Sequence, residues 1–116
     1  MKVVRVYTGD DGKSHFEDVE IELQNKGGVG LISDRWDVTG LMFRETDGDY
    51  NLDFHNAPRR QFVVNLDAAV EIEVGDGTKR VLQPGDILLA EDTTGQGHIS
   101  RAVDNKPRHS LFIALD

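Results

Sequence analysis

The stretch QFVVNLDAAVEIEVGDGTKRVLQPGDILLA, residues 61–90, decides the fold class. It contains two runs, residues 61–66 and 68–74, in which apolar side chains occupy every second position. A period of two is typical of a β-strand with one face in an apolar environment. Glycine and aspartate at 75–77 and 84–86 punctuate the stretch, because these residues suit tight turns. The stretch therefore predicts short strands joined by turns.

The same pattern continues over the rest of the chain. Residues 19–24 also alternate between apolar and polar side chains, and further candidate strands cover residues 2–7, 38–45, 79–83, 86–90, 98–103 and 109–115. No window of a dozen residues has an amphipathic helical pattern, so we expect little helix. Regularly spaced short strands indicate a β-sandwich or barrel. We predict one all-β domain over residues 1–116, with N-terminal strands within 1–45 and a barrel over about 50–116.

Composition limits the location and the partners of the protein. The chain has 116 residues, no cysteine, and 13 basic against 21 acidic side chains, for a formal charge of −8. Such a surface repels phosphate backbones, so nucleic acid is not expected as a partner. The N-terminus lacks the apolar run of a signal peptide, and no stretch approaches the roughly 18 apolar residues of a membrane helix. We expect a cytoplasmic protein without a membrane partner.

Residues 53–98 hold the polar side chains with the clearest functional spacing. Asp53 and His55 are two positions apart, so on a strand they project from one face. The segment Asn56-Ala57-Pro58 interrupts that strand, because proline cannot donate a ladder hydrogen bond. A polar loop over residues 91–97 then leads to His98 at the start of another strand.

These residues resemble the two motifs of the cupin family over about residue 50 to the C-terminus. The first cupin motif has His-x-His, then Glu and Gly; here Asp53, His55, Gln61 and Ala68 occupy those positions. The second motif has Gly, Pro-x-Gly, His and Asn, which correspond here to Gly85, Thr93, Gly95, His98 and Ala102, with two extra residues after Gly85. The resemblance implies a cupin-type antiparallel β-barrel, jelly-roll-like in topology.

The resemblance also implies a candidate metal site. Cupins bind iron, manganese, nickel or zinc with three His and one Glu, and the matching positions here are Asp53, His55, Gln61 and His98. Two imidazoles with one carboxylate form the facial triad of non-haem iron enzymes, and with water the same set serves zinc. Gln61 is a weaker, neutral oxygen donor that could instead orient a histidine or a bound ligand. A divalent metal ion and no cofactor at all are equally compatible with this set.

Other side chains are candidates for substrate binding or acid–base chemistry. Arg59 or Arg60 could offer a guanidinium to a substrate carboxylate or phosphate, and only one of two neighbouring strand residues can enter the pocket. Glu91 and Asp92 precede His98, so a carboxylate at the pocket mouth and His98 form a candidate catalytic pair. The alternative for each is a solvated surface or turn residue. His109 shares strand parity with Leu111 and is expected in the core.

The apolar residues of the 61–66 run predict an oligomer. If Gln61 faces the barrel interior, Phe62, Val64 and Leu66 face outward and need a cover. Small cupins commonly pair through strands laid over one another, so we expect a homodimer.

Three functions remain open from the sequence. The first is a metal-dependent oxygenase, isomerase or lyase acting on a small polar metabolite. The second is a non-catalytic cupin that binds or senses a metabolite, which the weakened ligand set favours. The third is metal-free acid–base catalysis by His98 with Asp92 or Asp53.

Overall fold

The computed structural model describes residues 1–116 and contains strands but no helix, which confirms the all-β prediction. No helix long and apolar enough to cross a membrane is present. The strands are β1 Lys2–Thr8, β2 Ser14–Glu20, β3 Gln24–Asn25, β4 Leu31–Ile32, β5 Gly40–Thr46, β6 Asn51–His55, β7 Gln61–Asn65, β8 Val70–Glu73, β9 Lys79–Leu82, β10 Ile87–Glu91, β11 His98–Ala102 and β12 Arg108–Ala114.

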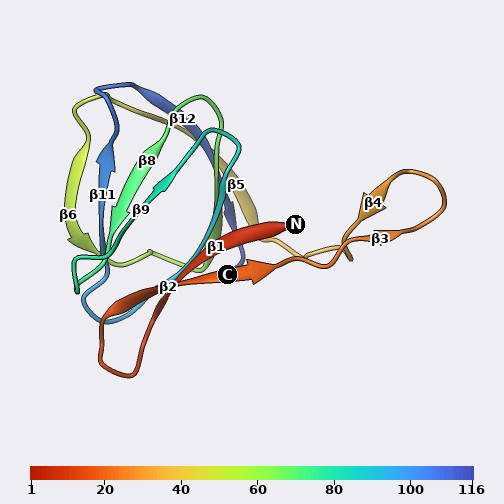
Figure 1. Ribbon diagram of the computed structural model, residues 1–116, viewed down its shortest axis with the longest axis horizontal. Helices are drawn as coiled ribbons and strands as arrows, with labels where there is room; N and C mark the ends of the chain where they lie inside the picture. The colour runs from red at the N-terminus through yellow and green to blue at the C-terminus, as the bar shows by residue number, and fades with distance from the viewer.

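Two sheets enclose the interior of the barrel (Figure 1). The larger sheet has the order β2-β1-β10-β7-β12-β5, and the smaller one has the order β6-β11-β8-β9. All pairings within these sheets are antiparallel except that of β1 with β10, which is parallel and places Val4 opposite Leu88. Strands β1 and β2 therefore extend the larger sheet.

Alternating apolar side chains from both sheets form one core. The buried members are Val4, Val6, Ala57, Val63, Val70, Ile72, Val74, Leu82, Leu88 and Ala90, with Phe16 and Phe112 packed against them. Most of these residues are β-branched, which suits them to the pleated strands that carry them. The strand period predicted from the sequence over 68–74 is confirmed, since Val70, Ile72 and Val74 are all buried.

Strand β7 has the orientation expected from the sequence. Gln61 and Asn65 are buried and face the interior, whereas Phe62 is partly exposed and Leu66 is half exposed on the outer side. Trp36, from the segment before β5, packs edge-on against Phe62 with ring centroids 5.1 Å apart. One part of the outer apolar face is therefore covered within the chain itself.

Strand β12 has the opposite orientation to the predicted one. His109, expected in the core, is 53% exposed and forms ion pairs with Asp67 and Glu45. The buried residues of this strand are Arg108, Ser110 and Ala114. The prediction was wrong because β12 is a central strand with apolar side chains on both faces, so alternation alone does not identify the inner one.

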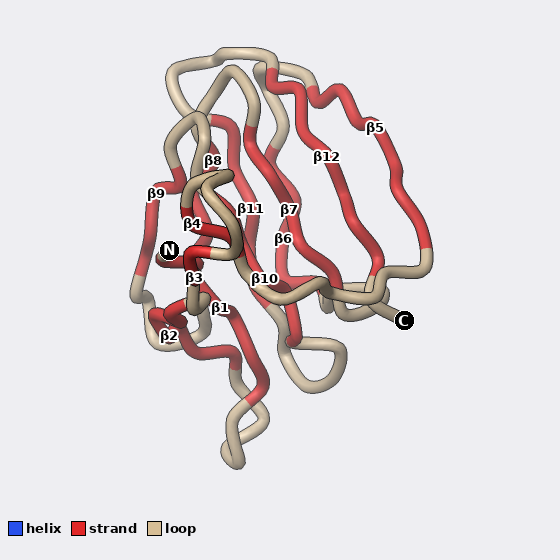
Figure 2. Tube along the Cα trace, turned by 90° about the vertical axis from the view of Figure 1, so that its right-hand side faces the viewer, coloured by secondary structure: helices blue, strands red, loops and turns tan.

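The segment between β2 and β5 leaves the barrel as an arm. Its short β3–β4 hairpin projects away from the two sheets (Figure 1), and a view turned by 90° shows it in front of them, while β7, β12 and β5 lie side by side (Figure 2). Of the three apolar residues that predicted a strand over 19–24, only Val19 lies in β2, which ends at Glu20. Ile21 and Leu23 therefore belong to the arm and not to the predicted strand.

Candidate functional site

A cavity of about 660 Å³ lies between the two sheets. Of its 22 lining residues, 12 are hydrophobic, and none is aspartate or glutamate. The polar and charged lining residues are Arg44, Tyr50, His55, Asn56, Arg59, Gln61, Asn65, His98, Ser100 and Arg108. An apolar cavity with a few convergent polar groups is the usual form of a small-molecule site.

His55 and His98 meet on neighbouring strands of the smaller sheet. They are register partners of β6 and β11, and their ring centroids are 4.5 Å apart. Gly97, directly before His98, has a φ of +79°, and a Cβ at this position would lie 2.0 Å from the backbone oxygen of His55. Only glycine permits this approach, so Gly97 allows the two histidines to come together.

A buried carboxylate orients His98. Asp92 Oδ2 lies 2.5 Å from His98 Nδ1 and accepts a hydrogen bond of 2.7 Å from Ser14 Oγ. Asp92 is fully buried, so it lies behind His98 rather than at the pocket mouth where the sequence placed it. A carboxylate that fixes one ring nitrogen of a histidine sets the tautomer and ring position, as in hydrolytic triads.

Both histidines use Nδ1 for a protein partner and leave Nε2 available. His55 Nδ1 donates to the carbonyl oxygen of Asp53 at 2.8 Å, because a carbonyl can only accept. Burial lowers the pKa of His55 from its ordinary value, and nearby His98 and Arg44 lower it further. At neutral pH, His55 therefore presents an unprotonated Nε2 that can accept a hydrogen bond or bind a cation.

The predicted metal ligands are not assembled as a set. No group of three or more His, Asp or Glu side chains is arranged to hold a metal ion. Asp53 is exposed, lies outside the cavity lining and accepts a hydrogen bond from Phe54 N. His55, His98 and Gln61 remain, which provide two imidazoles and a neutral amide. These residues do not fit the ligand set that the cupin resemblance implies, and metal binding stays a prediction.

Gln61 and Arg59 line the cavity, as the sequence suggested for pocket residues. The Oε1 atom of Gln61 is buried and has no hydrogen-bond partner in the protein. Arg59 forms no ion pair. Both side chains are therefore available to a ligand.

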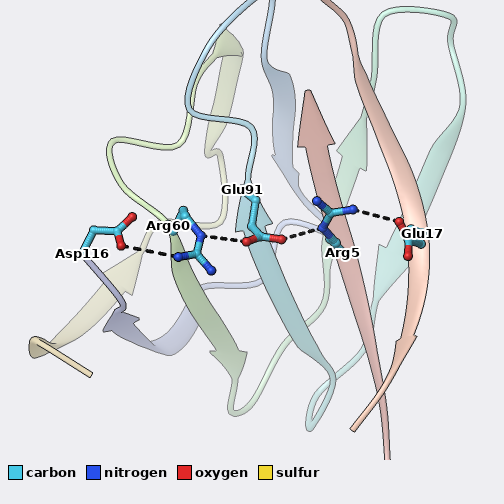
Figure 3. A network of polar contacts seen from close by, with 5 residues as sticks. All are labelled: Arg5, Glu17, Arg60, Glu91 and Asp116. Carbon is cyan, nitrogen blue, oxygen red and sulfur yellow. Dashed lines mark hydrogen bonds and ion pairs between the residues drawn. The ribbon is translucent and has the colours of Figure 1, made fainter. Parts of the chain in front are cut away.

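Arg60 and Glu91 lie outside the cavity, in a network on the outer face of the larger sheet (Figure 3). Arg60 Nε donates to Glu91 at 2.7 Å, and Arg5 Nε donates to the other Glu91 oxygen at 2.5 Å. Burial alone would raise the pKa of Glu91, but the hydrogen bonds from the two arginines hold it below its ordinary value. Of the two neighbouring arginines only Arg59 therefore lines the cavity, and Arg60 and Glu91 are surface residues, which was the alternative for each.

The sequence did not identify Arg44 and Arg108 as cavity residues. Arg108 is 6% exposed, and its Nη1 donates to Asn65 Oδ1 at 3.3 Å. Arg44 lies over the rings of Tyr50 and Phe112, 5.3 and 5.1 Å from their centroids. The sequence did not show which alternate residues of β12 point inward, and in the structure Arg108 points inward and His109 outward.

The fold and the cavity define a small all-β barrel protein with an internal cavity. Among solved structures, the chain is similar to protein NMB1881 from Neisseria meningitidis, with a TM-score of 0.51 and 12% identity over 84% of each chain. The EutQ protein of Salmonella typhimurium LT2 has a TM-score of 0.41 and 13% identity, over 98% of this chain and 94% of its own. No protein-family model and no curated protein matches the sequence. At such identity, the likeness to NMB1881 concerns the fold alone.

Proposed function

We propose that this protein binds a small organic molecule inside its barrel and that His98, held by Asp92, exchanges a proton with it. The observation that carries the proposal is the buried Asp92–His98 hydrogen bond in the wall of a 660 Å³ cavity. His98 Nε2 accepts a proton from the bound molecule, and Asp92 stabilises the imidazolium that forms. Return of the proton to another atom of the same molecule gives an isomerase or, with loss of a leaving group, a lyase.

The NMR signals of the four histidine imidazoles, recorded as ligands are added, test this proposal. The probes are a panel of four- to eight-carbon carboxylic acids, amides and alcohols, added to protein labelled with ¹⁵N. We expect binders to shift the signals of His55 and His98 and to leave exposed His109 unchanged. A panel that shifts neither cavity histidine overturns the proposal. Binding without turnover by the wild type, and equal binding by His98→Gln, would instead favour the non-catalytic metabolite-binding function.

A metal-dependent oxygenase, isomerase or lyase is the second candidate. The free Nε2 atoms of His55 and His98 favour it, since metal-bound histidines usually donate their other ring nitrogen to a carboxylate or carbonyl. Elemental analysis of untagged protein, purified without added metal or chelator, tests it. Stoichiometric iron, manganese, nickel or zinc that disappears in His55→Ala/His98→Ala supports the candidate. Protein that stays empty when offered these metals contradicts it.

A homodimer is the oligomeric state we propose, with the arm of one protomer against the sheet of the other. The hairpin has two residues per strand, too few for independent stability, yet Leu31 and Ile32 are 67% and 47% exposed on it. Strand β5, at the edge of the larger sheet, exposes Leu41 and Phe43 at 52% and 78%. A second copy covers both apolar surfaces at once, which motivates the choice of partner.

A further inference from the structure

The arginines of this chain divide into two groups by location. Five of the eight form ion pairs with carboxylates, and all five lie outside the cavity: Arg5, Arg35, Arg60, Arg80 and Arg101. The other three, Arg44, Arg59 and Arg108, form no ion pair, and all three line the cavity. The chain carries 21 acidic side chains, so carboxylates are not scarce. None of these carboxylates, however, lines the cavity.

Arg108 is the most constrained of the three. It is more than nine-tenths buried, and its one hydrogen bond is the long contact to Asn65. Burial lowers the pKa of Arg108 from its ordinary value, and the nearby charge of Arg44 lowers it further. A guanidinium has five N–H donors and stays charged in proteins, so most of the donors of Arg108 lack an acceptor. A buried cation without a counter-ion is costly unless something supplies the negative charge.

The groups nearest Arg108 in the strand register are uncharged hydroxyls, whereas the charges that act on it are those of Arg44 and, with the opposite sign, Asp67. Thr46 is the register partner of Arg108 on β5, and Ser110 follows on the same face of β12. The hydroxyl oxygens of both are buried without a hydrogen-bond partner. The hydroxyls make the region around Arg108 polar without neutralising it, and Asp67 is paired with His109 instead. A carboxylate in direct contact with Arg108 therefore has to come from outside the chain.

We propose that the cavity takes an organic carboxylate, whose carboxylate group binds Arg108 and whose apolar body lies against the hydrophobic lining. The proposal rests on the proposed function of the cavity as a ligand site and names the class of its ligand. A planar carboxylate matches one edge of a guanidinium with two parallel hydrogen bonds. A phosphate dianion is a poorer match, because 12 of the 22 lining residues are hydrophobic and two charges are harder to desolvate than one. Arg44 and Arg59 attract the anion at the cavity without being buried themselves.

Matched pairs of neutral and charged probes test the proposal. The probes are benzoate with benzamide and hexanoate with hexanamide, plus phenyl phosphate, and the cavity histidine signals report binding. We expect each carboxylate to bind at least about tenfold more tightly than its amide, as two charge-assisted hydrogen bonds predict. Amides that bind as tightly as the acids overturn the proposal and leave the cavity as a ligand site. Phenyl phosphate that binds more tightly than benzoate overturns it in favour of a phosphate ligand. Failure of every probe, alcohols included, overturns both.

Variants of Arg108 locate the preference. Arg108→Met should lower the acid-over-amide ratio severalfold, which leaves only the attraction of Arg44 and Arg59. Arg108→Lys, which keeps the charge but loses the planar fork of donors, should give an intermediate ratio. Arg35→Met is the matched control, because it removes one positive charge from a 90% exposed side chain that does not line the cavity. The control should keep the wild-type ratio. An unchanged ratio in Arg108→Met overturns the assignment, and the comparison of probes on the wild type holds even if that variant does not fold.

Discussion

The buried Asp92 carboxylate offers the most direct perturbation of the site. In Asp92→Asn the side chain keeps its size, but its charge is lost. In the wild type, one Asp92 oxygen accepts hydrogen bonds from Ser14 and His98, and the other oxygen has no protein partner. The new amide therefore makes neutral hydrogen bonds on one side and places an N–H₂ group without an acceptor on the other.

The magnitude follows from these two effects. Hydrogen bonds that involve a charged group contribute about 1.5–3 kcal/mol, and an unsatisfied buried donor costs about 1–3 kcal/mol. We expect Asp92→Asn to lower the free energy of unfolding by about 2–4 kcal/mol. Ser14→Ala, which removes one neutral donor, should cost about 1 kcal/mol. Asp53→Asn, at an exposed position, should stay within about 0.5 kcal/mol of the wild type.

Two assays measure the effect. Urea denaturation gives the free energy of unfolding for the three variants, and a ¹⁵N spectrum of the imidazoles gives the tautomer of His98. We expect the wild type to carry the proton of neutral His98 on Nδ1 and Asp92→Asn to show a weaker preference, because a neutral amide oxygen accepts this proton less strongly than a carboxylate. An Asp92→Asn protein as stable as the wild type, with His98 protonated on Nδ1 to the same extent, would refute the role assigned to Asp92.

Three further predictions follow from the geometry. Gly97→Ala should lower the free energy of unfolding by about 1–3 kcal/mol, because alanine disfavours the positive φ and its Cβ meets the backbone oxygen of His55. Gly77→Ala is the control and should cost less, because a Cβ at Gly77 would have no atom within 4 Å. Equal losses in the two variants contradict the argument. In an NMR titration His109 should titrate above the ordinary histidine value and His55 below it. The stabilisation by His109 is thus fully present below pH 6.5 and is lost as the pH rises through its folded pKa. The stabilisation by neutral His55 is present above pH 6.5 and is lost as the pH falls through its folded pKa. The reverse order of titration contradicts both assignments. Light scattering at micromolar concentration should give a dimer for the wild type and a monomer for Leu31→Asp, and a monomeric wild type contradicts the dimer.

Much of the candidate site could be predicted from the sequence, because it depends on local spacing. His55, Gln61 and His98 were identified from motif positions, and all three line the cavity. Asp92 and Asp53 were both candidate partners of His98, and the structure shows the hydrogen bond to Asp92. Asp53 was predicted from the same motif but lies outside the lining, because the register of β6 on β11 shifts between His55 and Leu52 and breaks the alternation of faces, so that these two residues line the cavity instead.

The sequence by itself determined the fold class, since strand period, glycine turns and the lack of helical amphipathicity are properties of short segments. It could not determine which face of β12 points inward, because that strand is apolar on both faces. Only the tertiary structure decided that Arg108 is buried, that Arg60 is on the surface and that no carboxylate enters the cavity. The physical reason is that the charges and hydrogen-bond partners around a side chain come from residues distant in the chain, such as Asn65 for Arg108 and Asp67 for His109. The positions of these partners follow from the order and register of the strands and not from the local sequence pattern.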